Sequence, residues 1–137
     1  MTRRSTAIVV LALVLAALVY WMQRDRQVDA LNEAIARNGS AALRAYPYQF
    51  RVLRLENGVA TMTTPRSPQV PVYRMIRAID PNLKPRDTRD PEFVAAEKAL
   101  ASVQEEARRI VLAQPDVKSV KWELDRNWLI DHGIPVD

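Results

Sequence analysis

The sequence predicts an α+β protein: an N-terminal transmembrane helix, then a small, mostly antiparallel three-stranded sheet covered by a long amphipathic helix. Three observations lead to this fold class. Residues 7–22 form an uninterrupted apolar run, Asn57-Gly58 separates two strand-like segments, and residues 91–114 carry apolar residues at helical spacing. A hairpin and a helix that are segregated along one short chain are typical of α+β folds. We expect an anchor with its interfacial flank at 1–26 and one small α+β extramembrane domain at 27–137.

The apolar run raises the question of whether the N-terminus is a retained anchor or a cleaved signal peptide. Its sixteen residues carry no charge and make about 24 Å of helix, at the short end for a membrane span. Cleavage after Ala16, a poor site, would leave an uncovered apolar stub. Aromatic residues followed by arginines end the run, as at a membrane interface, so retention is favoured. The expected anchor residues are Ala7, Leu11, Leu15, Leu18, Tyr20 and Trp21.

Charges that flank the run predict its orientation. Arg3, Arg4 and the α-amino group lie on the N-terminal side, against Arg24 and Arg26 on the other. The short tail and the free amine favour a cytoplasmic N-terminus under the positive-inside rule. In a bacterium, the protein would cross the inner (plasma) membrane once and residues 23–137 would be periplasmic. A cytoplasmic domain on the opposite orientation is the alternative.

Helical spacing continues beyond the run. The first helix is expected to extend to about Arg37 and to stop at Asn38-Gly39, with glycine in the left-handed conformation. Ser40 is then a suitable N-cap for a short helix that ends before Pro47.

The following segment has the period of a strand. Asn57-Gly58 is the pair that a type I′ hairpin turn prefers, because both central residues need a positive φ. The expected register pairs Leu55 with Ala60 and Leu53 with Met62. Apolar residues before Leu53 would then point to the other face, so the first strand is either covered on both faces or bulged.

Two helices and a third strand complete the expected fold. Pro71 is expected to begin a short helix with an apolar stripe of Val72, Met75, Ile76 and Ile79. The Asp-Pro-Glu sequence at 90–92 is a strong start for a second helix. The second helix should run to Gln114, which is longer than a small sheet needs, so its N-terminal part extends beyond the sheet. Residues 117–125 alternate like a strand, and Asp125 is expected to cap a last helical turn.

Few residues offer catalytic or metal-binding chemistry. The chain has no cysteine, and its only histidine, His132, lies in the last turn. Its serines fit no nucleophile-elbow pattern, and its three glycines form no phosphate-binding loop. Asp80, Asp87 and Asp90 surround a loop, where capping and solvation explain them better than metal binding. We therefore expect no catalytic, cofactor-binding or metal site, no cofactor and no enzymatic activity.

Positive charge is distributed unevenly. Residues 37–89 hold ten basic and three acidic side chains, whereas residues 90–137 hold six basic and ten acidic ones. Either the fold neutralises these halves against each other, or it presents a basic face to an anionic partner. A lipid surface suits such a face better than nucleic acid, because the basic residues are spread over several elements. The residues expected to form this anionic-partner patch are Arg51, Arg54, Arg74 and Arg77.

Three stretches occur in a familiar order: ALNEAIARNGSAALRAYPY, RVLRLENGVATMTT and EEARRIVLAQPDVKSVKWEL. Together they resemble the BON domain family, which has a helix, a glycine-turn hairpin, a helix and a last strand. The pattern departs at Asp116, where glycine is usual, at Thr63-Thr64 and in the extra segment 69–90. The resemblance implies an α+β envelope domain over residues 29–125 that binds phospholipid or partner proteins without catalytic residues. The matching residues are Asn57, Gly58, Val59, Pro115, Val117 and Val120.

The sequence as a whole predicts a single-pass envelope protein whose periplasmic domain binds a membrane lipid surface or an inner-membrane or periplasmic protein partner. The alternative is a small accessory subunit of a larger inner-membrane complex. That alternative predicts an exposed apolar patch beyond what the domain itself needs.

Overall fold

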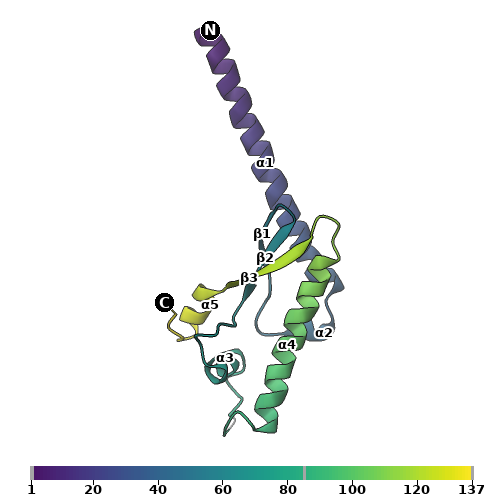
Figure 1. Ribbon diagram of the computed structural model, residues 1–137, viewed down its shortest axis with the longest axis vertical. Coiled ribbons are helices and arrows are strands. Elements are labelled where there is room, and N and C mark those ends of the chain that lie inside the picture. The colour runs from purple at the N-terminus through teal and green to yellow at the C-terminus, as the bar shows by residue number, and fades with distance from the viewer. Residues whose placement is uncertain (1, 85, 137) are drawn as a thin grey trace.

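The computed structural model describes residues 2–84 and 86–136. Outside them lie Met1, whose α-amino group contributes to the predicted orientation, Pro85 of the loop between Asp80 and Asp90, and Asp137. Helix α1 rises as a straight rod from a small body that holds the other elements (Figure 1), and the predicted α+β class is confirmed. The elements are α1 (Arg3–Asn38), α2 (Ala41–Ala45), β1 (Val52–Glu56), β2 (Val59–Thr64), α3 (Val72–Ile79), α4 (Pro91–Leu112), β3 (Ser119–Leu124) and α5 (Arg126–Asp131).

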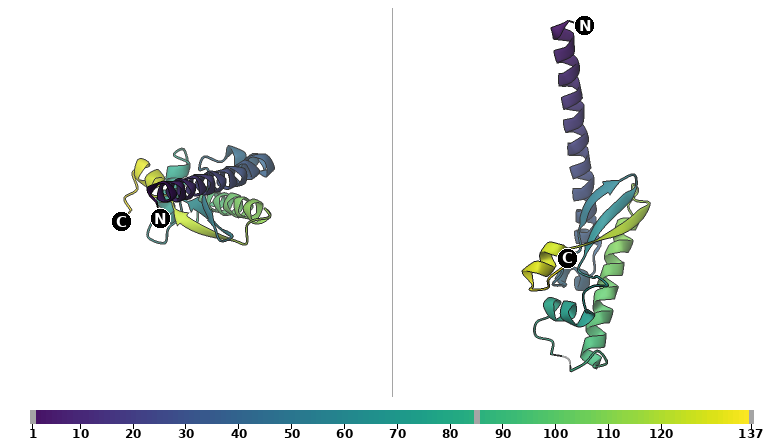
Figure 2. Two further views of the ribbon diagram at one scale, coloured as in Figure 1. Left: turned by 90° about the horizontal axis from the view of Figure 1, so that it is seen from above. Right: turned by 60° about the vertical axis from the view of Figure 1, so that its left-hand side comes forward.

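Helix α1 passes through two environments without a break. Its 36 residues correspond to about 54 Å, of which the N-terminal half stands clear of the body (Figure 2). Leu31, Ala34 and Ile35 in the C-terminal half are buried in the core. The predicted end of the helix at Asn38 is confirmed. The predicted left-handed glycine is wrong: Gly39 is extended, at φ −66°, and a Cβ there would lie 2.7 Å from the Ile35 carbonyl oxygen.

The sheet has the order β1-β2-β3 and is mixed. Strands β1 and β2 are antiparallel, whereas β2 and β3 are parallel. The expected antiparallel arrangement therefore holds for only one of the two strand pairs. Helix α4 carries the chain from one end of the sheet back to the other, as a crossover between parallel strands does.

The β1–β2 turn has the predicted conformation. Asn57 and Gly58 both have positive φ, at 51° and 78°. The Gly58 carbonyl accepts hydrogen bonds from the backbone N–H groups of Lys118 and Ser119, at 2.7 and 3.2 Å. A Cβ on Gly58 would also come within 2.9 Å of the Lys118 side chain. Glycine is thus required here both by backbone conformation and by the close approach of the α4–β3 loop.

A bulge corrects the predicted hairpin register. Leu55 pairs with Ala60 as expected, but Met62 pairs with Val52 rather than with Leu53. The register shifts between Val52 and Arg54, so one residue of β1 has no opposite partner. The shift lets Val52 and Leu55 both be buried, which resolves the two alternatives that the apolar pattern left open.

Helices α1 and α4 pack against each other and cover one face of the sheet, with α1 beside β1 and α4 beside β3 (Figure 2). Helix α4 begins at the predicted Asp90 N-cap and ends two residues earlier than predicted. Its N-terminal part extends beyond the sheet as expected, and α3 covers it, with Tyr73 stacked on Phe93 at 6.0 Å. The largest residues of the core include Tyr48, Met62, Ile76, Phe93, Leu100 and Leu129.

Candidate functional site

Helix α1 is, among the described residues, the one helix long and apolar enough to cross a membrane. Its apolar part makes no contact that buries it: Leu11, Leu15 and Leu18 are 60 %, 53 % and 54 % exposed. Ala7, Tyr20 and Trp21 are exposed as well. By length and composition, this segment is compatible with a single membrane anchor or with a signal sequence.

The C-terminal end of the apolar run is tied to the domain. The Arg24 guanidinium lies over the rings of Tyr20 and Trp21, at 5.5 and 5.6 Å from their centroids. It also forms an ion pair with Glu56 at the end of β1. One arginine therefore links the aromatic residues at the expected membrane interface to the hairpin. A cavity of about 360 Å³ lies beside this contact, bounded also by Gln27, Asn57 and Asp116.

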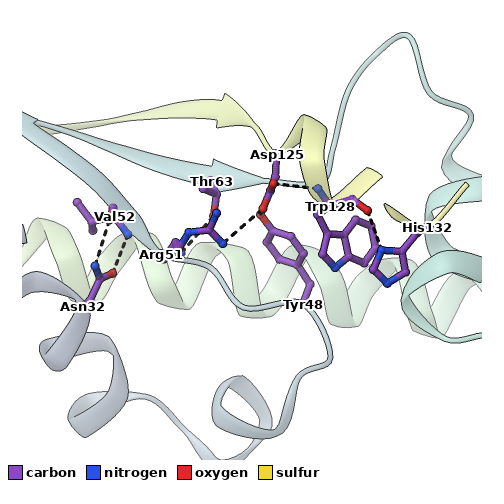
Figure 3. Close-up of polar contacts among 8 residues, drawn as sticks. All are labelled: Asn32, Tyr48, Arg51, Val52, Thr63, Asp125, Trp128 and His132. Atoms are coloured by element: carbon purple, nitrogen blue, oxygen red, sulfur yellow. Dashed lines mark hydrogen bonds and ion pairs between the residues drawn. The ribbon is translucent and has the colours of Figure 1, made fainter. Parts of the chain in front are cut away.

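Asn32 on α1 hydrogen-bonds to both backbone groups of Val52 at the β1 edge. Its Nδ2 donates to the Val52 carbonyl oxygen at 3.1 Å, and its Oδ1 accepts from the Val52 N–H at 2.7 Å (Figure 3). The side-chain amide thus takes the place of a neighbouring strand's peptide group. Edge strands otherwise leave such groups open to pairing with another chain. This role was not predictable from the sequence, because an asparagine within a helix gives no local signal of it.

A second set of hydrogen bonds holds the C-terminal end of α1 against α4. The N–H and the hydroxyl of Ser40 both donate to the Glu106 carboxylate, each at 2.6 Å. These hydrogen bonds lower the pKa of Glu106. Ser40 also accepts from the Leu43 N–H as the predicted cap of α2. The contacts of Arg24, Asn32 and Ser40 therefore hold the C-terminal half of α1 to the hairpin, the β1 edge and α4.

The structure divides the four arginines of the predicted patch into two pairs. Arg54 donates to Glu123 at 2.7 Å, which raises the pKa of Arg54 and lowers that of Glu123. Arg51 lies 3.6 Å from the buried Asp125. Two of the arginines are therefore neutralised by acids at β3 and its end. The fold here brings the basic and acidic halves of the chain together.

The other two arginines lie on α3. Arg74 approaches the Gly133 carbonyl oxygen at 3.5 Å, and the Arg77 guanidinium lies 5.8 Å from the centroid of the Tyr73 ring. Both line a shallow pocket of about 270 Å³ together with His132. This pocket and the sheet carry separate pairs of arginines.

Asp125 organises a small buried cluster at the end of β3 (Figure 3). It accepts from the Trp128 N–H as the predicted cap of α5, and the Tyr48 hydroxyl donates to it at 2.9 Å. Burial raises the pKa of Tyr48 above its ordinary value. The cap was predictable from sequence, whereas the tyrosine contact joins residues 77 positions apart.

His132 is occupied by its neighbours. Its ring stacks on Trp128 with centroids 3.9 Å apart, and its Nδ1 lies 2.7 Å from the Trp128 carbonyl oxygen. Within residues 2–84 and 86–136, no group of three or more His, Asp or Glu side chains is placed to hold a metal ion. Asp80, Asp87 and Asp90 each bond to a nearby backbone N–H, as loop and capping residues do.

Apolar surface outside the apolar run of α1 is scarce. In the part of the chain that the structure describes, Ile130 is the single large hydrophobic residue beyond Met22 that is highly exposed, at 57 %. One isolated side chain is ordinary for a soluble surface. No family model, curated protein or solved structure matches this chain.

Proposed function

We propose that this chain is a single-pass membrane protein with a cytoplasmic N-terminus, whose residues 23–137 form a periplasmic domain at the inner membrane. The domain binds a protein partner at the membrane surface and catalyses no reaction. The order helix, hairpin, helix and parallel strand supports a BON-like domain as its scaffold, with α3 as an insertion. A lipid surface is the alternative partner.

The observation that carries the proposal is the unbroken helix α1. Its C-terminal half is part of the domain core through Leu31, Ala34 and Ile35. A membrane segment that continues into such a helix without a flexible linker sets the height and tilt of the domain above the bilayer. Removal of residues 1–16 as a signal peptide would leave Leu18, Tyr20 and Trp21, each more than half exposed, as an uncovered apolar end. Retention of the anchor is therefore favoured.

Charge favours a protein over a lipid surface as the partner. An anionic bilayer attracts clusters of unpaired basic residues close to the membrane. Arg51 and Arg54 are paired with acids, and Arg74 and Arg77 lie on α3, at the end of the body away from the apolar half of α1 (Figure 1). The cavity nearest the apolar run is bounded by Arg24, Glu56 and Asp116, which is a mixed rather than a basic lining.

The experiment is mass spectrometry of the C-terminally tagged full chain, purified from its native membranes in mild detergent. We expect the full-length mass and a stoichiometric protein companion that stays bound in high salt. The accessory-subunit alternative predicts an exposed apolar patch, and the described residues beyond Met22 expose only one large hydrophobic residue, the isolated Ile130. A mass that begins near Ala17 would disprove the anchor. Retention of lipid alone, released by salt, would replace the protein partner with a lipid surface.

A further inference from the structure

The two edges of the sheet differ in what covers them. At the β1 edge, α1 and the Asn32 amide occupy the outward-facing groups of Val52. At the other edge, β3 lies at the free side of the sheet in both Figure 1 and Figure 2. Strand β3 contributes six residues, Ser119–Leu124, without a bulge or a proline.

The hydrogen-bond pattern tells which groups of β3 face outward. The N–H groups of Ser119 and Asp125 donate to Gly58 and Thr64 of the β2 side. Backbone groups of alternate residues in a parallel strand point to opposite sides. The N–H and C=O groups of Val120, Trp122 and Leu124 therefore point away from β2, and no hydrogen bond joins them to another part of the described chain.

Side chains along β3 give this edge two different faces. Val120, Trp122 and Leu124 are half-buried on the side of the helices, and Trp122 meets Phe50 edge-to-face at 6.2 Å. On the opposite side, Glu123 is held by Arg54, whereas Lys121 is exposed and forms no ion pair with any described residue. The edge is thus apolar on one face and carries one unpaired positive charge on the other.

We propose that the free edge of β3 binds an extended segment of the protein partner, which adds a fourth strand to the sheet. This inference rests on the proposed function and names where that partner binds. The segment presents apolar residues at alternate positions, beside Trp122, and an acidic residue opposite Lys121. Main-chain hydrogen bonds supply affinity in such strand addition, and the alternate side chains supply specificity.

A second copy of this chain does not fit the edge. Two copies anchored in one membrane are related by a two-fold axis along the membrane normal, which is the direction of α1. Antiparallel pairing of β3 with its own copy needs a two-fold axis perpendicular to the sheet. The right-hand view of Figure 2 shows the broad face of the sheet while α1 runs upright, so that perpendicular lies across α1. With the proposed anchoring, this geometry excludes pairing of β3 with β3 of a second copy, and we assign the edge to a segment of a different protein.

The direct test uses the full-length chain in detergent micelles and a short capped peptide of alternating valine and threonine with one glutamate placed to meet Lys121. Amide hydrogen exchange is read residue by residue. We expect slower exchange at Val120, Trp122 and Leu124 when the peptide is added. Lys121 and Glu123, whose N–H groups already face β2, should not change. Absence of protection at the three outward amides would overturn the proposal.

A matched pair of variants tests the backbone contribution. Val120→Pro removes one outward N–H and places its ring on the edge, at a position where proline is tolerated in strands. Val120→Ala trims the same side chain and keeps the N–H. We expect the proline variant to bind the peptide about tenfold more weakly than the alanine variant, a difference of about 1.4 kcal/mol. Equal binding by both variants would contradict strand addition.

Charge reversal tests the specificity without a backbone change. Lys121→Glu should lose preference for the glutamate peptide and gain preference for the same peptide with lysine at that position. Unchanged preference would remove Lys121 from the proposal. The proposed function fails in a different way: a wild-type chain without any protein companion would disprove it even if the peptide binds. A companion that Val120→Pro retains as firmly as Val120→Ala would instead disprove the edge alone.

Discussion

The two edges of one small sheet show opposite solutions to the same physical problem. Each outer strand has backbone groups that β2 cannot satisfy. At β1, helix α1 packs beside the strand and the amide of Asn32 satisfies the outward N–H and C=O of Val52. At β3 the corresponding groups face outward. Uncovered edges can pair with other chains, so the difference is what the proposed strand addition at β3 rests on, while the β1 edge packs against helix α1.

The largest expected effect comes from proline substitutions in β3, which should show that its N–H groups alternate between facing β2 and facing outward. Lys121→Pro removes an N–H that faces β2 and should lower the free energy of unfolding by about 3 kcal/mol or more. Val120→Pro removes an N–H that faces outward and should cost about 1 kcal/mol, through lost packing only. Urea unfolding of the full chain in detergent, followed by near-ultraviolet circular dichroism, gives both values. Equal losses would mean that the β3 edge is not free.

The stability of the domain at the β1 edge should depend on the burial of the C-terminal half of α1. Leu31 is 5 % exposed, and Leu31→Ala should lower the free energy of unfolding by about 3 kcal/mol, because a cavity replaces its side chain. Leu15→Ala, in the exposed part of the same helix, is the control and should leave domain stability unchanged. If both substitutions act alike in the same unfolding measurement, the two halves of α1 do not have separate roles.

Loss of the Asn32 amide should uncover the β1 edge without removing the helix. Asn32→Ala leaves the Val52 N–H and C=O unpaired and should cost about 2 kcal/mol. Asn32→Asp keeps an acceptor for the Val52 N–H, but its carboxylate cannot donate to the Val52 carbonyl oxygen and repels it. Amide exchange of Val52 should therefore speed up more in the alanine variant than in the aspartate variant. The reverse order would show that this bond does not protect the edge.

The smallest expected effect is a pH dependence at the corner where α1 meets α4. Hydrogen bonds from Ser40 lower the pKa of Glu106 in the folded state. The unfolded state then binds a proton at higher pH, so this stabilisation is present above about pH 4.3 and is lost as the pH falls through the folded pKa. Glu106→Gln should make the free energy of unfolding fall less steeply as the pH is lowered below about 4.3. An unchanged slope would assign the acid dependence to other carboxylates.

At the alkaline end, burial raises the pKa of Tyr46 to about 12. Its protonated form therefore stabilises the fold below about pH 10, the ordinary value of an exposed tyrosine, and the benefit is lost as the pH rises through the folded pKa. Tyr46→Phe should shift the onset of alkaline unfolding upward, as measured by the same circular dichroism signal.

Local chemistry made much of the fold predictable. The caps at Ser40, Asp90 and Asp125, and the turn at Asn57-Gly58, each depend on residues within four positions of one another, and all four have the expected role. The bulge in β1 was only one of two alternatives, because the strand pattern alone does not tell which residue loses its partner. The prediction for Gly39 was wrong because its N–H donates to the Ile35 carbonyl oxygen at 2.9 Å from an extended backbone, so the helix end needs no left-handed residue.

The predicted arginine patch shows the limit of reading charge along the chain. Arg51 and Arg54 belong to a basic half of the sequence, but their acids lie 69 or more positions further along. Only the parallel placement of β3 brings Glu123 across the sheet to Arg54. A count of charges by segment cannot detect this pairing.

The sequence by itself determined the apolar N-terminal helix, the α+β class, the hairpin and the helix starts, because period, caps and turn residues act over a few positions. The tertiary structure alone decided the parallel pairing of β3, the Asn32 contact, the division of the arginines and the free edge. These depend on which distant segments meet, and a strand's outward groups are known only once its neighbours on both sides are known.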